Sequence, residues 1–276
     1  MSQITKASDD FINVERVIAS KNEKILRWLP KFIINYLKRI IHQDFVNSFI
    51  RRNEAKSGLD FVEAILDEFG VEVTWEGEEH LLNNQRCMIA ANHPLGGMDG
   101  IALMYVAGKF RKDIQFPVND LLMNIPNLKE LFVPINKHGS NMENARIIDQ
   151  SFASDVMMLF FPAGLVSRKQ KGVIKDLEWK KTFIRKSRTY KRDIIPTYIN
   201  GKNSNWFYGL ANWRKRFGIS VNLEMLYLAD EMVKQKGKKI HIKFGPAISY
   251  QDFRKGKSDV EWAAIVKEKV YQLQYN

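Results

Sequence analysis

The sequence has a single cysteine, Cys87, among its 276 residues. An internal disulfide and a thiolate metal cluster are therefore excluded, and we expect this thiol to be buried and inert. Long hydrophobic runs are also missing, since a membrane-spanning helix needs about 20 apolar residues and the best run, 156–166, is shorter. The first residues are polar and acidic and show no secretory signal. These absences predict a soluble or peripheral protein of the reducing cytoplasm.

Acidic residues are in deficit, with 31 Asp and Glu against 43 Lys and Arg, a formal net charge of +12. Such an excess favours anionic partners: nucleic acid, lipid headgroups or phosphorylated substrates. Several catalytic motifs are absent as well, namely Gly-x-Ser-x-Gly, His-Glu-x-x-His, Cys-x-x-Cys and Gly-x-Gly-x-x-Gly. The sequence therefore does not indicate the hydrolases, redox proteins and dinucleotide-binding enzymes that use these motifs.

What the chain does contain is an alternation of strand and helix patterns. We predict strands at 71–75, 87–91, 114–118, 131–137, 156–161, 193–199 and 239–244. We predict helices at 31–52, 58–69, 97–107, 143–152, 222–235 and 260–273. This alternation predicts an α/β fold with a central, mostly parallel sheet covered by helices. We divide the chain into an N-terminal helical extension, 1–70, that could contact a membrane, and an α/β domain, 71–276.

The residues richest in chemistry follow the strand 87–91, in the sequence Ala-Asn-His-Pro-Leu-Gly-Gly-Met-Asp-Gly at 91–100. Proline and two glycines permit a sharp turn before a helix, an arrangement that exposes a reactive group at a sheet edge. Asp99 would hold one imidazole nitrogen of His93 as a donor, while the other nitrogen takes a proton from a hydroxyl near neutral pH. The alternative is that both residues serve only as turn and helix-cap residues.

At these residues the chain resembles the glycerolipid (lysophosphatidic acid type) acyltransferase superfamily, and most closely its bacterial hemolysin-like branch. In the superfamily four residues separate the histidine from the aspartate, whereas five separate His93 from Asp99. The hemolysin-like branch shares this longer turn with two glycines. The resemblance covers residues 70–250 and implies an acyltransferase fold, a catalytic His93 and Asp99, and substrate contacts from Asn92, Gly96 and Gly97.

Two further blocks of the superfamily are altered in this sequence. Lys137 stands where an arginine contacts a substrate phosphate, so the charge is kept without the planar fork. An ordinary surface lysine is the alternative there. The block Phe-Pro-Glu-Gly reads Phe-Pro-Ala-Gly at 161–164, which keeps Pro162 and Gly164 but replaces the acceptor-positioning glutamate with Ala163. The resemblance therefore leaves the usual glycerol-phosphate acceptor in doubt.

The hemolysin-like branch shares Phe-Pro-Ala-Gly with a following Ser-Arg pair, so Ser167 and Arg168 are candidates for compensating substrate contacts. Pro196, in the strand 193–199, matches a fourth block, an apolar-Pro-apolar element that lines the acyl or acceptor channel. The resemblance thus adds Pro162, Gly164, Ser167, Arg168 and Pro196 to the expected substrate-binding residues.

Two basic segments each allow two interpretations. Residues 31–52 place apolar side chains four apart and form one basic amphipathic helix, which would lie on an anionic bilayer or pack on the protein's own core. Related acyltransferases use N-terminal helices to meet the bilayer. Residues 168–192 carry eleven Lys and Arg against two acidic residues. They suit a phosphate-bearing donor or anionic lipid, or form a solvated helix face.

Together these features predict an O-acyltransferase that moves a fatty acyl group from acyl-CoA or an acyl carrier protein to a hydroxyl of a lysolipid or amino-acid lipid precursor. No metal and no resident cofactor are implied. The expected partners are this acceptor, the thioester donor and an anionic membrane surface, without nucleic acid, on the inner face of the cytoplasmic membrane. A metal-dependent hydrolase using His93 and Asp99, and a basic nucleic-acid-binding module, stay open as alternatives.

Overall fold

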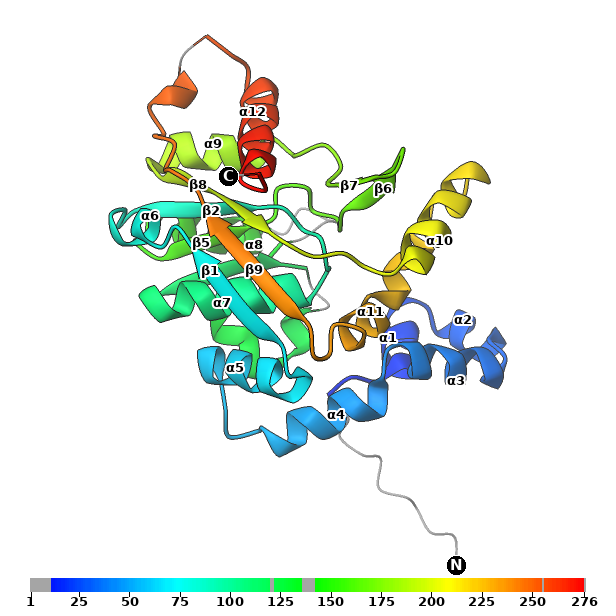
Figure 1. Cartoon of the computed structure of the whole chain (residues 1–276). Coiled ribbons are helices and arrows are strands. Elements are labelled where there is room, and N and C mark those ends of the chain that lie inside the picture. Colours follow the sequence, from blue (N-terminus) through cyan, green and yellow to red (C-terminus); the bar gives the residue numbers. More distant parts are fainter. Residues whose placement is uncertain (1–10, 120–121, 136–141, 255, 276) are drawn as a thin grey trace, which may run out of the picture.

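Figure 1 shows the computed structural model, which describes residues 11–119, 122–135, 142–254 and 256–275. One sheet crosses the middle of the molecule, with helices on both of its faces. Its strands are β1 (Glu72–Glu76), β2 (Cys87–Ala91), β3 (Ile114–Val118), β4 (Phe132–Pro134), β5 (Met157–Phe160), β8 (Asp193–Ile199) and β9 (Lys239–Phe244). A separate antiparallel hairpin consists of β6 (Arg168–Gln170) and β7 (Val173–Lys175).

The strand order in the sheet is β1-β9-β8-β2-β5-β3-β4. Strands β8, β2, β5, β3 and β4 run parallel to one another, β1 runs parallel to β9, and β8 meets β9 antiparallel. The predicted mostly parallel sheet is therefore confirmed. β2 is buried throughout because it lies between two strands and helices cover both faces of the sheet there. Burial raises the pKa of the Cys87 thiol to about 11, as expected of an inert cysteine.

The helices α1 to α12 lie around this sheet. They are α1 (Val14–Lys21), α2 (Glu23–Trp28), α3 (Lys31–Ile40), α4 (Gln43–Arg52), α5 (Gly58–Phe69), α6 (Glu79–Leu82), α7 (Met98–Phe110), α8 (Met142–Ala153), α9 (Thr182–Tyr190), α10 (Asn205–Arg216), α11 (Leu228–Val233) and α12 (Asp259–Gln272). Short 3-10 turns are η1 (Leu122–Asn124), η2 (Pro126–Leu131), η3 (Leu223–Tyr227) and η4 (Asp252–Arg254). Within the described ranges, no helix is both long enough and apolar enough to span a bilayer.

The core is split between the two faces of the sheet because side chains alternate along a strand. Cys87, Ile89 and Ala91 of β2 belong to the apolar cluster that also holds residues of α5 and α7. Met88 and Ala90 belong to a second cluster, formed with residues of α8, α9 and α12. Both faces of β2 are therefore packed, which makes the carboxyl end of this strand a rigid place for reactive groups.

The prediction of one amphipathic helix over 31–52 is wrong. The helix stops at Ile40, and His42 has a left-handed backbone (φ 54°), so α3 and α4 take different directions. Phe49 of α4 is buried, and its ring packs 5.4 Å from the ring of Phe61 in α5. The apolar row of the C-terminal half thus packs on the protein's own core, because a turn of the backbone brings it there.

The single helix predicted over 222–235 is also wrong. The chain forms η3 and then the short α11, and Glu224 within η3 is turned inward between two arginines. The sequence patterns did not predict α6, α9, α10 or the hairpin β6–β7, because these short or polar elements lack strong apolar periodicity.

Candidate active site

The candidate site lies at the edge of the sheet where the parallel strands β2, β5 and β8 end. His93 follows the end of β2 by two residues, and α7 begins five residues later at Met98. The segments after β5 and β8 reach the same edge because those strands run in the same direction as β2. The predicted strand, turn and helix are thus present, and chain segments distant in sequence surround the turn.

His93 and Asp99 lie in direct contact across this turn. Nδ1 of His93 is 2.9 Å from Oδ2 of Asp99, and the side chains are 16% and 0% exposed. The same carboxylate oxygen accepts the backbone N–H groups of Leu95 (2.8 Å) and Gly96 (3.2 Å), and the other oxygen accepts that of Gly100 (2.9 Å). Asp99 is therefore held by both the turn and the first turn of α7, so that it fixes the imidazole orientation.

Charge around the pair sets its protonation. Burial lowers the pKa of His93, but the negative charge and hydrogen bond of Asp99, together with the charge of Asp176, outweigh it, so the pKa lies above the usual value. Burial raises the pKa of Asp99, but His93 and the N–H groups of the turn lower it by more, and its pKa lies below the usual value. The carboxylate therefore stays charged near neutral pH, as an orienting group must.

Both predicted glycines lie inside the turn. Gly96 has a left-handed backbone (φ 84°), and a Cβ there would lie 2.6 Å from Cδ2 of Leu228 and 2.8 Å from Cγ2 of Val166. Gly97 caps α7, and a Cβ there would lie 3.4 Å from Sδ of Met232. The absence of a side chain at Gly96 thus permits the turn itself and lets the η3–α11 segment pack closely against it.

Asn92, Ser167 and Arg168 have polar contacts within the protein. The Asn92 amide receives the Ile199 N–H at 2.6 Å and donates to the Ile199 carbonyl at 2.9 Å, which ties β2 to the end of β8. Ser167 donates to Asp176 at 2.5 Å, and Arg168, almost fully buried, donates to Glu224 at 2.7 Å. These contacts give all three residues a supporting role around the turn, while a direct substrate contact by any of them stays a prediction.

The Phe-Pro-Ala-Gly segment follows β5 and passes beneath the imidazole. The ring of Phe161 stacks on that of His93, with centroids 4.1 Å apart. Ala163 is buried in the apolar cluster with α8, α9 and α12. Pro162 is buried, and its carbonyl accepts the N–H of Lys180, while Gly164 has a left-handed backbone (φ 63°). The methyl group at 163 thus occupies a core position.

Two other predicted site residues, Pro196 and Lys137, are not among those that the structure describes beside the turn. Pro196 is buried inside β8 and pairs with Ala90 of β2, so it lies within the sheet before the candidate edge. Lys137 lies outside the described residues, and its predicted phosphate contact stays a prediction.

The basic segment 168–192 does not form one continuous charged surface. Arg168 and Arg192 at its two ends are buried. Lys175, Lys186 and Arg188 form ion pairs with Glu268, Asp149 and Asp259, respectively. Neither the helix-face reading nor a single phosphate-binding patch describes the whole segment, because it includes a hairpin, a loop and α9.

Two residues of the site were missed from the sequence. Asp176 accepts the backbone N–H of His93 at 3.2 Å, and Phe161 stacks on the imidazole. Asp176 counted only as one acid in a basic run, and no local signal links it to a turn 83 residues away. Among the described residues, no group of three or more His, Cys, Asp or Glu side chains is arranged to hold a metal ion.

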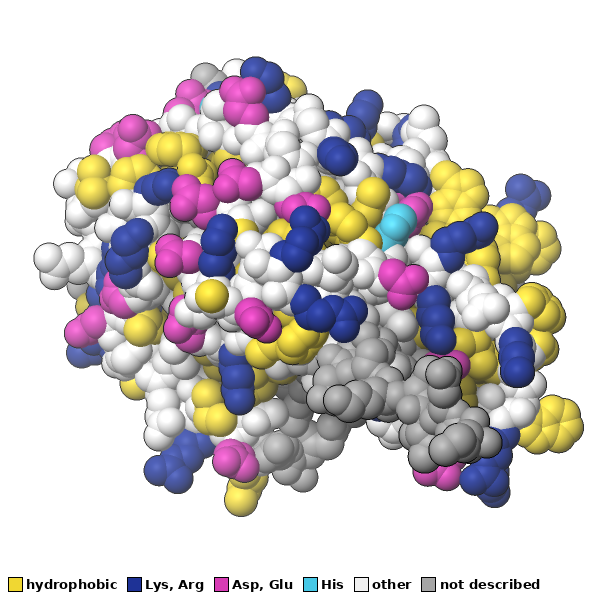
Figure 2. All heavy atoms as spheres, turned by 90° about the horizontal axis from the view of Figure 1, so that it is seen from below, with side chains coloured by type: hydrophobic (Ala, Val, Ile, Leu, Met, Phe, Trp, Pro, Cys, Tyr) yellow, Lys and Arg dark blue, Asp and Glu magenta, His cyan; other side chains and the backbone are white. Residues whose placement is uncertain are grey.

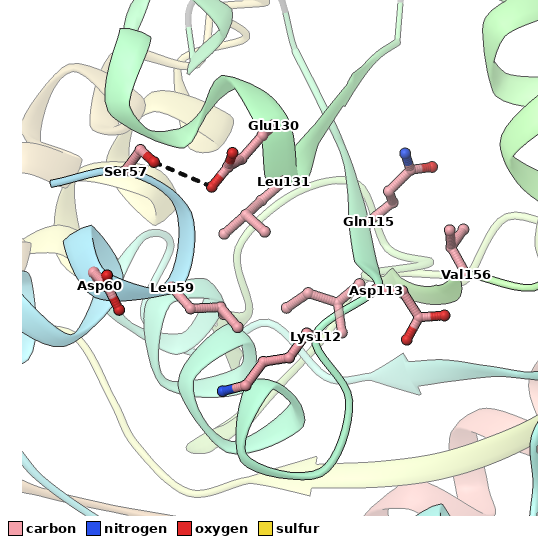
Figure 3. Close-up of a pocket in the computed structure, with 10 residues that line it drawn as sticks. Ser57, Leu59, Asp60, Lys112, Asp113, Gln115, Glu130, Leu131 and Val156 are labelled. Atoms are coloured by element: carbon pink, nitrogen blue, oxygen red, sulfur yellow. Dashed lines mark hydrogen bonds between the residues drawn. The ribbon is translucent and has the colours of Figure 1, made fainter.

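A hollow of about 470 Å³ lies at the amino end of β3, with Leu59, Lys112, Asp113, Glu130 and Leu131 among its lining residues (Figure 3). Because β2, β5 and β3 all begin at that edge, the hollow and His93 lie at opposite ends of the strands. None of the predicted site residues that the structure describes lines it.

The chain is similar to known proteins over nearly its whole length. The family model described as Acyltransferase matches residues 16–276. A protein of Phocaeicola vulgatus named lyso-glycine lipid O-acyltransferase is 44% identical over 275 residues, covering 98% of this chain and 99% of that protein. A protein of Bacteroides thetaiotaomicron with the same name is 46% identical over 264 residues, covering 95% and 97%, respectively. The crystal structure of the 1-acyl-sn-glycerophosphate acyltransferase from Thermotoga maritima aligns with a TM-score of 0.48 and 16% identity, covering 89% of this chain and 98% of that one.

Proposed function

The chain belongs to the acyltransferase family, and from that premise we propose that it esterifies the hydroxyl of a lyso-glycine lipid with a fatty acyl group from a thioester donor. The donor is acyl-CoA or an acyl carrier protein. The observation that carries the proposed chemistry is the 2.9 Å contact between His93 and Asp99 at the edge of the sheet. The acceptor is taken from the two relatives, each of which matches this chain over at least 97% of its own length.

In the proposed reaction His93 is the general base. Its Nδ1–H donates to Asp99, so Nε2 is the nitrogen that takes the proton from the acceptor hydroxyl. The hydroxyl oxygen attacks the thioester carbonyl carbon, and the resulting tetrahedral intermediate collapses with cleavage of the carbon–sulfur bond. The sulfur then leaves as a thiol after taking the proton from the imidazolium. The products are an ester and the free thiol, and no protein nucleophile is needed.

An acceptor assay tests this function. The purified protein is given acyl-CoA or acyl carrier protein thioesters with either a lyso-glycine lipid or lysophosphatidic acid. We expect kcat/KM for the lyso-glycine lipid to exceed that for lysophosphatidic acid by about tenfold or more, because Ala163 supplies no carboxylate where the superfamily positions its glycerol-phosphate acceptor. Ester formation on lysophosphatidic acid alone, or on neither lipid, would contradict the proposed acceptor.

We also propose that α2 and α3 contact an anionic membrane surface. Trp28 and Phe32 are 88% and 71% exposed, and the exposed side chains of Arg27, Lys31 and Arg39 lie on the same two helices. Figure 2 shows hydrophobic side chains gathered with Lys and Arg at the right of the molecule, the side that carries these helices in Figure 1. Aromatic side chains among basic ones suit the boundary between lipid headgroups and acyl chains.

Replacing Trp28 and Phe32 together with alanine is expected to weaken binding to phosphatidylglycerol-containing vesicles by about 100-fold, since each buried aromatic side chain contributes roughly 1.5 kcal/mol. Sedimentation with vesicles measures this. The control is Leu82→Ala on α6, another exposed apolar side chain, which lies on the opposite side of the molecule (Figure 1). Equal binding by the double variant and the control would exclude this surface.

A further inference from the structure

Asp176 lies behind the catalytic turn, just after β7, and is only 5% exposed. Oδ1 accepts the backbone N–H of His93 at 3.2 Å and the hydroxyl of Ser167 at 2.5 Å. Oδ2 accepts the indole N–H of Trp179 at 2.8 Å. Burial raises the pKa of this carboxyl above its usual value, and three donors from three parts of the chain oppose that effect by stabilising the charged form.

The main chain of Asp176 is itself held by side chains of α12. The hydroxyl oxygen of Tyr271 accepts the backbone N–H of Asp176 at 2.7 Å, and Nζ of Lys267 donates to the carbonyl oxygens of Asp176 and Leu177 at 2.8 and 3.0 Å. Ser167 adds a second link, because its backbone N–H donates to the His93 carbonyl at 2.8 Å. The main chain of His93 is thus bonded on its N–H side by Asp176 and on its carbonyl side by Ser167.

We propose that Asp176 is a positioning residue for acyl transfer, which fixes the main chain of His93 while Asp99 and Phe161 fix its ring. This role rests on the proposed function of His93 as the general base. Asp99 sets the rotation of the imidazole, but it cannot place the Cα atom from which the side chain extends. Asp176 and Ser167 supply that placement, and a displacement of about 1 Å at a reacting group costs up to about 100-fold in rate.

Asp176 also acts on His93 through its charge. The charged groups that face the imidazole are Asp99 from α7, Asp176 from the segment after β7, and Arg168 from β6. Burial lowers the pKa of His93, and both carboxylates raise it. Because a general base works in its neutral form, the loss of the Asp176 charge moves the acid limb of the rate profile to lower pH.

The test is Asp176→Asn, which keeps the size of the side chain and removes its charge. We expect kcat to fall by about 10- to 100-fold with little change in KM, and the acid limb of kcat/KM to move to lower pH. The His93 imidazole, followed by NMR on the protein with labelled histidines and assigned with His93→Gln, is expected to titrate at lower pH. The NMR titration needs no substrate, so it tests the role of Asp176 even if the proposed reaction is wrong. If the proposed reaction is wrong, the wild-type protein is inactive in the acyl-transfer assay.

Asp193→Asn is the matched control. Asp193 begins β8 at the opposite edge of the sheet, and its carboxylate accepts hydrogen bonds from Asn84 and the Tyr250 N–H. It should leave the His93 titration unchanged. Trp179→Phe removes one hydrogen-bond donor to Asp176 but keeps the charge of Asp176 and the aromatic packing. This variant replaces Asp176→Asn in the kinetic test if Asp176→Asn does not fold. We expect a fall in kcat of about 3- to 10-fold for it. An unchanged His93 titration in folded Asp176→Asn, or a wild-type kcat in either variant, would overturn the proposal.

Discussion

Replacing His93 with alanine is expected to lower kcat for acyl transfer by about 10²- to 10⁴-fold, the range that general bases contribute. The imidazole is the only titratable group in the turn whose usual pKa lies near neutrality, and its neutral form is needed to take the hydroxyl proton. His93→Gln should lose as much activity, because an amide can donate to Asp99 but cannot take up a proton near neutral pH. Steady-state assays of both variants measure the effect.

Lipid mass spectrometry of cells with and without the variant extends the test to the natural product. One diacylated lipid class should disappear in cells that carry only His93→Ala. The control is His241→Ala, since His241 lies in β9, two strands from β2, and its side chain pairs with Glu76 of β1 instead of with Asp99. Thermal unfolding should show both variants folded. An unchanged lipid profile in a folded His93→Ala strain would count against the general-base mechanism.

Replacing Arg192 with methionine is expected to lower the free energy of unfolding by about 3–5 kcal/mol, because buried carbonyl groups lose hydrogen bonds that contribute roughly 1 kcal/mol each. Arg192 is fully buried, yet its guanidinium donates to five backbone carbonyl oxygens, those of Cys87, Ser151, Phe152, Ser154 and Val156. Burial lowers its pKa to about 10, which still leaves it charged near neutral pH. Methionine fills a similar volume but leaves those carbonyls without this donor.

Urea denaturation of purified variants measures the change. Arg188→Met is the matched control, because Arg188 is partly exposed and pairs with Asp259 on the surface, where an ion pair contributes at most about 1 kcal/mol. Arg192→Lys should lie between the two, since an ammonium group has only three protons to donate. If the free energy of unfolding of Arg192→Met is within about 1 kcal/mol of the wild-type value, the hydrogen bonds from Arg192 to the five carbonyls do not stabilise the fold as proposed.

The sheet and the contact between His93 and Asp99 were predictable because their signals are local. The strands β2, β5 and β8 each have an apolar run that the sheet buries, and β2, β3, β8 and β9 have the predicted bounds. His93 and Asp99 share one turn, so six residues of sequence were enough to predict their contact. The acyltransferase family was likewise predictable from motifs in their expected order, and the match over residues 16–276 confirms it.

The rest of the site depends on contacts between distant segments, which local patterns do not contain. Arg168 counts in the sequence as part of a basic run, but its partner Glu224 lies 56 residues later and turns it into a buried structural group. Asp176 was missed for the same reason, because in the sequence it is only an acidic residue within a basic segment. The break between α3 and α4 depends on one left-handed residue, His42, which no helical periodicity reveals.

The antiparallel pairing of β8 and β9 makes the two sides of the candidate site different. On one side, the strands β2, β5 and β3 end at this edge of the sheet. On the other side, β9 and β1 begin there. The chain therefore enters the sheet there through η3 and α11, and Leu228 and Met232 lie beside Gly96 and Gly97. Leu228 and Met232 thus border the turn only on the side of β9, so a single reversed strand pair makes the two sides of the turn chemically different.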